Sequence, residues 1–165
     1  MSPKVVLVGP PGSGKSTVAT RLANRLGLPH EDADTLVETK AGKAISDIFI
    51  DSGEAEFRRL EREAVIEVLG HDGIVSLGGG AVLDQDTRAD LAGHTVVFLD
   101  VSLSEAATRV GLGTSRPLLL GNVRGRLKQL MDARRPLYAE VATFTVDTNG
   151  RKADEIADEI AGKVS

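Results

Sequence analysis

The chain has 165 residues, of which 20 are basic and 24 acidic, for a formal net charge of −4, and it contains no cysteine. This length suits one domain with a buried core, so we expect a single domain over residues 1–165. The near balance of charge argues against nucleic acid or an anionic membrane as a partner, and the lack of cysteine excludes disulfides and thiolate chemistry. Because no apolar run has membrane-spanning length and no signal-peptide pattern opens the sequence, we expect a cytoplasmic protein.

The first motif along the chain is a glycine-rich loop. Residues 9–17 read Gly-Pro-Pro-Gly-Ser-Gly-Lys-Ser-Thr and match the phosphate-binding pattern GxxxxGK[ST]. A buried strand is predicted at residues 5–8 before the loop, and apolar residues at helical spacing predict a helix after it. Glycines let backbone N–H groups surround phosphates, Lys15 reaches the β and γ oxygens, and the Ser16 hydroxyl ligates magnesium. The loop therefore predicts binding of a nucleoside triphosphate with Mg²⁺, since a turn without a ligand has no use for the Gly-Lys-Ser run.

Two aspartates follow the first predicted helix. Gly27 and Pro29 predict the end of that helix, and a short extended segment leads to Asp32 and Asp34. In a strand both carboxylates would point to one side, where one could hold Mg²⁺ through water and the other could orient or deprotonate an attacking hydroxyl. Alternatively, Asp34 only caps a helix that begins near Thr35. The pair alone does not decide between these interpretations.

A long helical stretch is predicted at residues 43–69, with a break at 51–53. It carries Arg58 and Glu61, whose spacing of three places them on one helix face. Glu61 could thus hold the guanidinium rigidly for a carboxylate ligand. Two solvated surface charges would show the same pattern, and the spacing alone favours that simpler interpretation.

Three glycines, residues 78–80, come directly after a short β-branched run at 74–77. They form either a tight turn or a stretch of bare backbone against which a ligand lies. Ligands of open α/β sheets gather at the C-terminal ends of strands, so the position favours the ligand. A helix is predicted next at 86–91, followed by a buried strand at 95–99 and a helix that carries Arg109.

The apolar period fails beyond residue 111, where Arg116 lies between glycines. This pattern suggests a mobile lid, at about residues 111–124, that closes over phosphates and supplies positive charge. An ordinary exposed loop is the alternative, although three consecutive leucines are unusual in one. The remaining elements are predicted as a helix at 124–133, a new helical turn starting at Pro136, a strand at 141–146 and an amphipathic helix at 153–164.

Strands that alternate with helices after a phosphate-binding loop imply a mostly parallel sheet covered on both faces. In addition, six ordered motifs resemble the shikimate kinase family over essentially the whole chain. They are GPPGSGKST, DAD at 32–34, FRRLE at 57–61, LGGG at 77–80, RPLL at 116–119 and RRPLY at 134–138. The resemblance implies a P-loop three-layer α/β/α fold with a five-stranded parallel sheet in the order 2-3-1-4-5. It also implies a helical substrate-binding region at about 33–61.

The resemblance further implies roles for single residues. The catalytic residues would be Asp34, as candidate base, with Lys15 and Arg116. Shikimate would contact Asp34, Arg58, Gly79 and Arg134, and Mg²⁺ would be held by Ser16 and, through water, by Asp32. The ATP-binding residues would be Gly12, Ser13, Gly14, Lys15, Ser16, Thr17, Arg109, Arg116 and Arg151.

The implied activity is Mg²⁺-dependent transfer of the ATP γ-phosphoryl to the 3-hydroxyl of shikimate, a step of chorismate and aromatic amino acid biosynthesis. We expect a monomer whose partner is this small molecule. A related kinase of gluconate or a nucleotide would keep the loop and lid, but Asp34, Arg58, Gly79 and Arg134 jointly suit an unphosphorylated carboxylate with several hydroxyls. A non-catalytic nucleotide-sensing module would want a guanine-reading NKxD run, which the sequence lacks.

Overall fold

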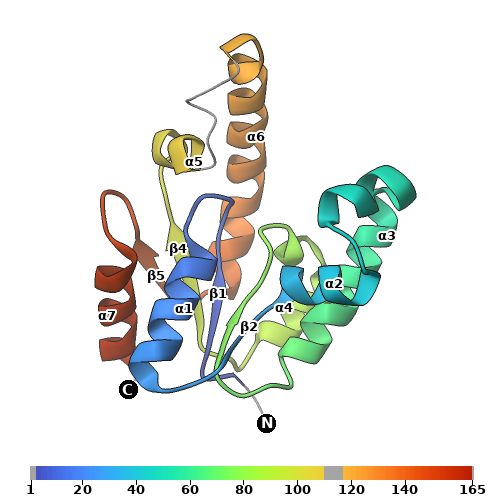
Figure 1. The fold of residues 1–165 in the computed structure, drawn as a ribbon. Helices are drawn as coiled ribbons and strands as arrows, with labels where there is room; N and C mark the ends of the chain where they lie inside the picture. Colours follow the sequence, from blue (N-terminus) through green and yellow to red (C-terminus); the bar gives the residue numbers. More distant parts are fainter. Residues whose placement is uncertain (1–2, 110–116, 165) are drawn as a thin grey trace.

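A computed structural model describes residues 3–109 and 117–164 of the chain, without the side chains of residues 117–123. Five parallel strands form one sheet in the order β2-β3-β1-β4-β5, between two layers of helices (Figure 1). The predicted fold class and strand order are thereby confirmed. The strands are β1 Val5–Val8, β2 His30–Asp32, β3 Ile74–Ser76, β4 Val96–Asp100 and β5 Phe144–Asp147.

The helices alternate with the strands along the chain, as the hydrophobic periodicity predicts. They are α1 Lys15–Leu26, α2 Ala33–Ala41, α3 Ile45–Val68, α4 Gln85–Leu91, α5 Leu103–Arg109, α6 Pro117–Val141 and α7 Ala153–Val164, with a 3₁₀ turn η1 at Ala81–Leu83. The predicted break in the third helix is confirmed, because Gly53 has the non-helical angles φ 83° and ψ 172° inside α3.

The central strand β1 shows how the core is built on both faces of the sheet. Its four residues are all buried, and successive side chains point to opposite faces because a strand has a period of two. Val5 and Leu7 pack in the cluster formed with α1 and α7. Val6 and Val8 pack in the other cluster, which includes residues of α3 and α6. An uninterrupted apolar run is therefore what this position requires.

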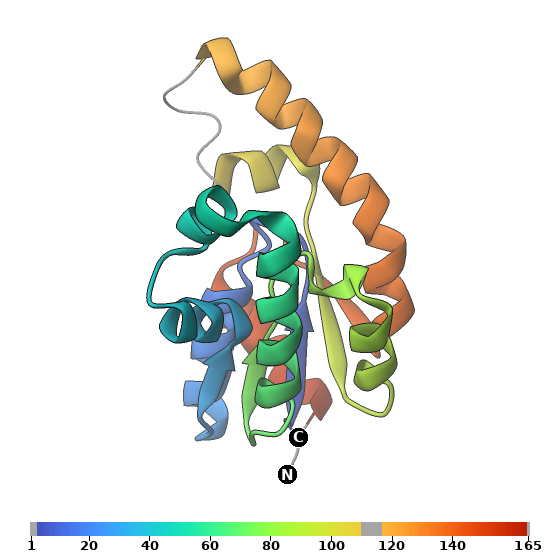
Figure 2. The ribbon, with the colours of Figure 1, turned by 90° about the vertical axis from the view of Figure 1, so that its right-hand side faces the viewer.

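The phosphate loop leaves β1 at the edge of the sheet where the parallel strands end. Beyond this edge, the N-terminal half of α6 projects past the sheet, as the two perpendicular views show (Figures 1 and 2). The helices α2 and α3 flank the same edge on the other side. Ligands collect at this edge in open α/β sheets, so the fold places the loop where a site is expected.

Three predicted boundaries are wrong. The segment from Pro117 onward is helical, not aperiodic, and α6 continues through Pro136 to Val141 instead of starting a new turn there. Proline costs a helix about 3 kcal/mol because it lacks the N–H donor. The burial of Leu127, Met131 and Tyr138 along one face of α6 offsets that cost. The last strand consequently begins only at Phe144.

Candidate active site

The phosphate loop reaches its shape through glycines with positive φ. Gly9, Gly12 and Gly14 have φ of 155°, 81° and 86°, and a Cβ on Gly12 would lie 2.8 Å from the Ala106 carbonyl oxygen of α5. A side chain at Gly12 would thus be strained by its backbone and would also collide with α5. The loop ends at Lys15, the first residue of α1, so the positive end of the helix dipole faces the loop.

Lys15 is held at the mouth of this loop by backbone carbonyls. Its Nζ donates to the Gly9 oxygen at 2.7 Å and to the Pro10 oxygen at 3.1 Å. Burial lowers the pKa of Lys15 to about 8, and the nearby carboxylates of Asp34 and Asp32 oppose that shift. The ammonium is therefore poorly compensated in the ligand-free protein, and anionic phosphate oxygens would supply the compensation.

Asp32 caps α2, a role that the alternative interpretation had given to Asp34. Its Oδ1 accepts a hydrogen bond from the Thr35 N–H at 3.0 Å. Its Oδ2 accepts from the hydroxyls of Ser16 at 3.1 Å and Ser76 at 2.7 Å. Asp34 lies one residue inside the helix, in its first turn, so it neither caps α2 nor continues the strand. Both sequence interpretations of Asp34 are therefore wrong in their local geometry.

Asp34 nevertheless lines the same cavity as the phosphate loop. This cavity has a volume of about 530 Å³, and its walls include Lys15, Asp32, Gly78 and Gly79. The Oδ1 atom of Asp34 is buried and has no hydrogen-bond partner among the described residues. Burial raises the pKa of Asp34, the negative charge of Asp32 adds to the shift, and Lys15 opposes it. A buried carboxylate oxygen without a donor is costly, and a hydroxyl of a bound ligand would satisfy it.

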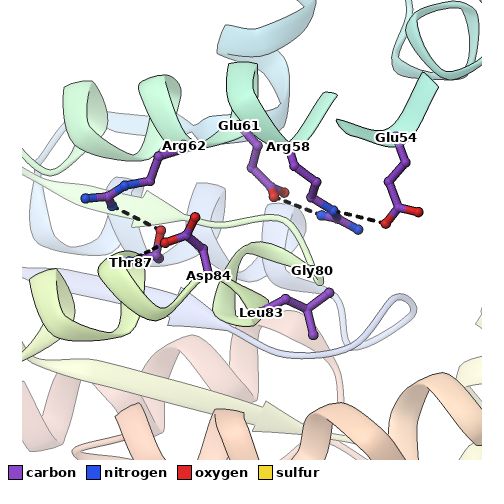
Figure 3. Close-up of a pocket in the computed structure, with 8 residues that line it drawn as sticks. All are labelled: Glu54, Arg58, Glu61, Arg62, Gly80, Leu83, Asp84 and Thr87. Atoms are coloured by element: carbon purple, nitrogen blue, oxygen red, sulfur yellow. Dashed lines mark hydrogen bonds and ion pairs between the residues drawn. The ribbon is translucent and has the colours of Figure 1, made fainter. Parts of the chain in front are cut away.

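Arg58 and Glu61 form an ion pair that is buried on one side. Glu61 Oε1 lies 2.8 Å from Arg58 Nη1, and the Glu61 residue is only 4% exposed. The interpretation of two solvated charges is therefore wrong for this pair. Burial raises the pKa of Glu61, while the hydrogen bond and charge of Arg58 lower it. Glu54 contacts the same guanidinium from the exposed side at 3.4 Å (Figure 3).

These side chains form one wall of a second cavity, of about 300 Å³, between α3 and the segment from Gly80 to Thr87 (Figure 3). Its other charged groups already have partners. Arg62 donates to Thr87 at 3.1 Å and to Asp90 at 2.6 Å. Arg58 is thus the residue that this cavity shares with the substrate-binding set expected from the sequence.

The glycine turn is tied to α6 by a tyrosine that the motif contains but the residue assignments left out. The Tyr138 hydroxyl donates to the Gly79 oxygen at 2.5 Å, and the residue is 1% exposed. Burial raises the pKa of Tyr138 to about 12. Arg134 lies one turn earlier on α6, and its charge lowers the pKa of both Lys15 and Glu61. The structure thus brings Arg134 and Gly79 close to the cavity of the phosphate loop.

Arg109 and Arg151 lie at the end of the phosphate loop that faces α5 and α7, and Arg109 also lines the 530 Å³ cavity. Arg109 donates to the Gly12 oxygen at 3.1 Å and to the Thr148 oxygen at 2.7 Å. Arg151 pairs with Glu159 at 2.8 Å. Both arginines line a cavity of about 160 Å³, which also includes Ser13, Gly14 and Thr17.

Glu105 is a further residue at this end that the site assignments missed. Its two carboxylate oxygens accept from the Gly150 N–H at 2.8 and 2.9 Å, and Oε2 lies 3.4 Å from Arg109. Glu105 precedes Arg109 by four residues, a spacing that places the two side chains on one helix face, and this spacing could have indicated their contact. Arg116 lies outside the described residues, as does the first part of the expected lid.

The described residues contain no group of three or more histidine, aspartate and glutamate side chains that could enclose a metal ion. The hydroxyl of Ser16 and the carboxylate of Asp32 lie 3.1 Å apart at the loop. Such hard oxygen donors, few in number, fit Mg²⁺, which keeps several waters and binds through substrate phosphates. Among the described helices, none is long and apolar enough to cross a membrane.

The fold and this loop together define a P-loop nucleotide-binding protein, in which the Asp34 carboxylate lines the cavity of the phosphate loop and Arg58 lines the second cavity. A profile described as "Shikimate kinase" matches residues 11–165. The chain belongs to the shikimate kinase family.

Two curated relatives share much of the sequence. This chain is 59% identical to a shikimate kinase of Salinispora arenicola, over 98% of this chain and 97% of that one. It is 55% identical to one of Thermobifida fusca, over 96% and 93%. Among solved structures, the chain is similar to a shikimate kinase from Acinetobacter baumannii in complex with shikimate, with a TM-score of 0.90 and 34% identity, over 99% and 93% of the two chains. The family resemblance read from the motifs is thereby confirmed.

Proposed function

We propose that this chain transfers the γ-phosphoryl group of ATP to the 3-hydroxyl of shikimate, giving shikimate 3-phosphate and ADP. The observation that carries the proposal is the buried Oδ1 of Asp34 in the cavity of the phosphate loop, which has no hydrogen-bond partner within the described part of the chain. It supplies an acceptor for a hydroxyl next to a loop built for phosphates. The Acinetobacter baumannii relative, solved with shikimate, supports the choice of substrate.

Asp34 orients the 3-hydroxyl and accepts its proton as the new bond forms between the hydroxyl oxygen and the γ-phosphorus. The bond from that phosphorus to the β,γ-bridging oxygen breaks, and the electron pair leaves with ADP. The raised pKa of Asp34 makes the carboxylate a stronger base than a solvent-exposed aspartate. Lys15 and the N-terminus of α1 stabilise charge on the phosphate oxygens throughout the transfer.

Arg58 and Arg134 hold the carboxylate of shikimate from two sides. The buried pair with Glu61 fixes the guanidinium of Arg58 before substrate arrives, which lowers the entropy lost on binding. Arg134 approaches from α6, and Gly79 contributes its backbone. Shikimate carries no phosphate, so a site with two arginines away from the phosphate loop suits its carboxylate better than a second nucleotide.

Mg²⁺ is proposed at Ser16, with Asp32 acting through water, and it would supply charge neutralisation at the β and γ oxygens. Gly12, Ser13, Gly14 and Thr17 complete the phosphate contacts. Arg109 and Arg151 are assigned to the base end of ATP because both line the cavity there. Arg116 is assigned to the transferring phosphate.

We further propose that residues 1–165 act as one cytoplasmic, monomeric unit, with substrate-binding region 33–61 and a lid at about 111–124. The closed lid would keep water away from ATP.

The test is coupled ADP release by the purified protein with ATP and Mg²⁺, with and without shikimate. We expect shikimate to raise turnover by orders of magnitude, and quinate, gluconate and nucleoside monophosphates to have little effect. Stimulation by gluconate or a nucleotide instead would replace the substrate and keep the P-loop chemistry. Slow ADP release that no acceptor changes would refute the roles of Asp34, Arg58 and Arg134.

A further inference from the structure

The glycines at 78 and 80 are not explained by backbone conformation. Neither has a positive φ, and Gly80 has φ −99° and ψ 0°, which other residues adopt. Both positions are buried. Glycine is also the residue that allows another group to approach the backbone closely. The explanation for these two glycines is therefore steric.

At Gly80 the space is taken by Arg58. A Cβ on Gly80 would lie 2.7 Å from Arg58 Nη2 and 2.9 Å from Cζ, and its three nearest neighbours all belong to this guanidinium. The nearest of these atoms is Nη1, the same atom that the buried Glu61 holds at 2.8 Å. Figure 3 places Gly80 on the segment that faces α3 across the cavity. Glu61 thus holds the Arg58 guanidinium in the space that a side chain at position 80 would occupy.

At Gly78 the same relation holds with Asp34. A Cβ there would lie 2.5 Å from Oδ1 and 2.9 Å from Oδ2, and the three nearest atoms all belong to the Asp34 carboxyl group. Oδ1 is the buried oxygen without a hydrogen-bond partner among the described residues. Between the two positions, Gly79 is fixed to α6 through the Tyr138 hydroxyl at 2.5 Å. The turn is therefore anchored independently of the two side chains that rest on it.

We propose that Gly78 and Gly80 are positioning residues for phosphoryl transfer: Gly80 sets the place of the Arg58 guanidinium, and Gly78 sets the place of the Asp34 carboxylate. The proposal rests on the function proposed above, in which Arg58 holds the carboxylate of the acceptor and Asp34 its hydroxyl. One anchored turn then fixes the spacing between the two groups that bind the same small molecule. A methyl group at position 80 displaces Arg58 and leaves Asp34 in place. A methyl group at position 78 displaces Asp34 and leaves Arg58 in place.

The atoms that a methyl group would meet are the ends of flexible side chains, not backbone. The fold should therefore tolerate Gly78→Ala and Gly80→Ala, and both substitutions should instead impair substrate binding or turnover. Gly80→Ala should raise the shikimate KM about tenfold while the ATP KM stays within about twofold. Gly78→Ala should lower kcat about tenfold to a hundredfold, because misplacement by roughly 1 Å has effects of that size.

Gly162→Ala is the matched control, since Gly162 lies on α7 and, apart from its chain neighbours and its own helix backbone, no described atom lies within 4 Å of an added Cβ. It should leave both KM values and kcat unchanged. All three variants should unfold at a midpoint temperature close to that of the wild type. If Gly78→Ala or Gly80→Ala fails to fold while Gly162→Ala folds, that glycine serves the fold, and the proposal is overturned for it.

A double-mutant cycle separates positioning from a general disturbance of the site. If Gly80→Ala acts by moving Arg58, adding it to Arg58→Ala should change the shikimate KM by less than about twofold. An equal penalty in both backgrounds would overturn the proposal, as would a Gly80→Ala variant with wild-type kinetics.

Crystal structures of both alanine variants give a readout independent of turnover. A displaced Arg58 guanidinium and a displaced Asp34 carboxylate support the steric relation, and unmoved side chains overturn it. If the wild type itself does not phosphorylate shikimate, the proposed function fails separately, and these structures still decide the steric relation.

Discussion

Glu61 and Glu54 both contact Arg58, but their side chains are 5% and 66% exposed. Glu61→Ala removes the buried acceptor, so the guanidinium must be ordered each time substrate binds. Ordering one such side chain costs about 0.5–1.5 kcal/mol. The shikimate KM should therefore rise about two- to twelvefold, while the ATP KM stays within about twofold. Coupled ADP release at saturating ATP, with shikimate varied, measures the change.

Glu54→Ala is the matched control, because it removes the exposed partner of the same guanidinium at 3.4 Å. Exposed pairs contribute about 0–1 kcal/mol, so its shikimate KM should change less than about twofold. Glu61→Gln keeps an acceptor but no charge and should fall between the wild type and Glu61→Ala. Equal effects of Glu54→Ala and Glu61→Ala would refute the view that burial of the pair orients Arg58.

Three further predictions concern other groups of the site. Burial lowers the pKa of Lys15 from 10.5 to about 8, so between these pH values the unfolded chain binds more protons than the folded one. The free energy of unfolding should therefore rise with pH across this window, by at most about 3 kcal/mol. Urea denaturation of the ligand-free protein at pH 7.5 and 10 should show this rise, and Lys15→Met should lack it; the same rise in both proteins would contradict the prediction. Asp34→Asn should lower kcat about a hundredfold, and in the wild type kcat should fall as the pH is lowered through the raised pKa of Asp34. A pH profile of kcat for both proteins tests these two expectations. Wild-type turnover by the variant would rule out a role of Asp34 as base. Tyr138→Phe leaves the Gly79 carbonyl without its donor and should lower the free energy of unfolding by about 1–2 kcal/mol in urea; an unchanged value would mean that water or another donor replaces the hydroxyl.

Much of the fold follows from local sequence. The strand at Val5–Val8, the loop and α1 are contiguous in the chain, and their apolar periods and glycines specify them without long-range contacts. The sequence also indicated the break near Gly53 and the Gly27 cap of α1, because both require a conformation that glycine adopts readily. The phosphate site was therefore predictable from one segment.

The rest of the site depends on contacts between distant segments. Spacing alone allowed Glu61 to be either a solvated charge or a rigid partner of Arg58, and only the packing of α3 decided that it is buried. Likewise, the continuation of α6 through Pro136 depends on what its buried face contacts, not on the local cost of proline.

The sequence by itself determined the phosphate loop, the alternation of elements and, through its ordered motifs, the family. Tertiary structure decided what lies against the glycine turn. Tyr138 meets Gly79 across 59 positions, and the space at Gly78 and Gly80 is filled by Asp34 and Arg58 from other elements. A local pattern describes the conformation that a residue prefers, but it does not contain the atoms of distant segments, which here lie within 3 Å of a Cβ added at Gly78 or Gly80. The chemistry of this turn is therefore set by packing.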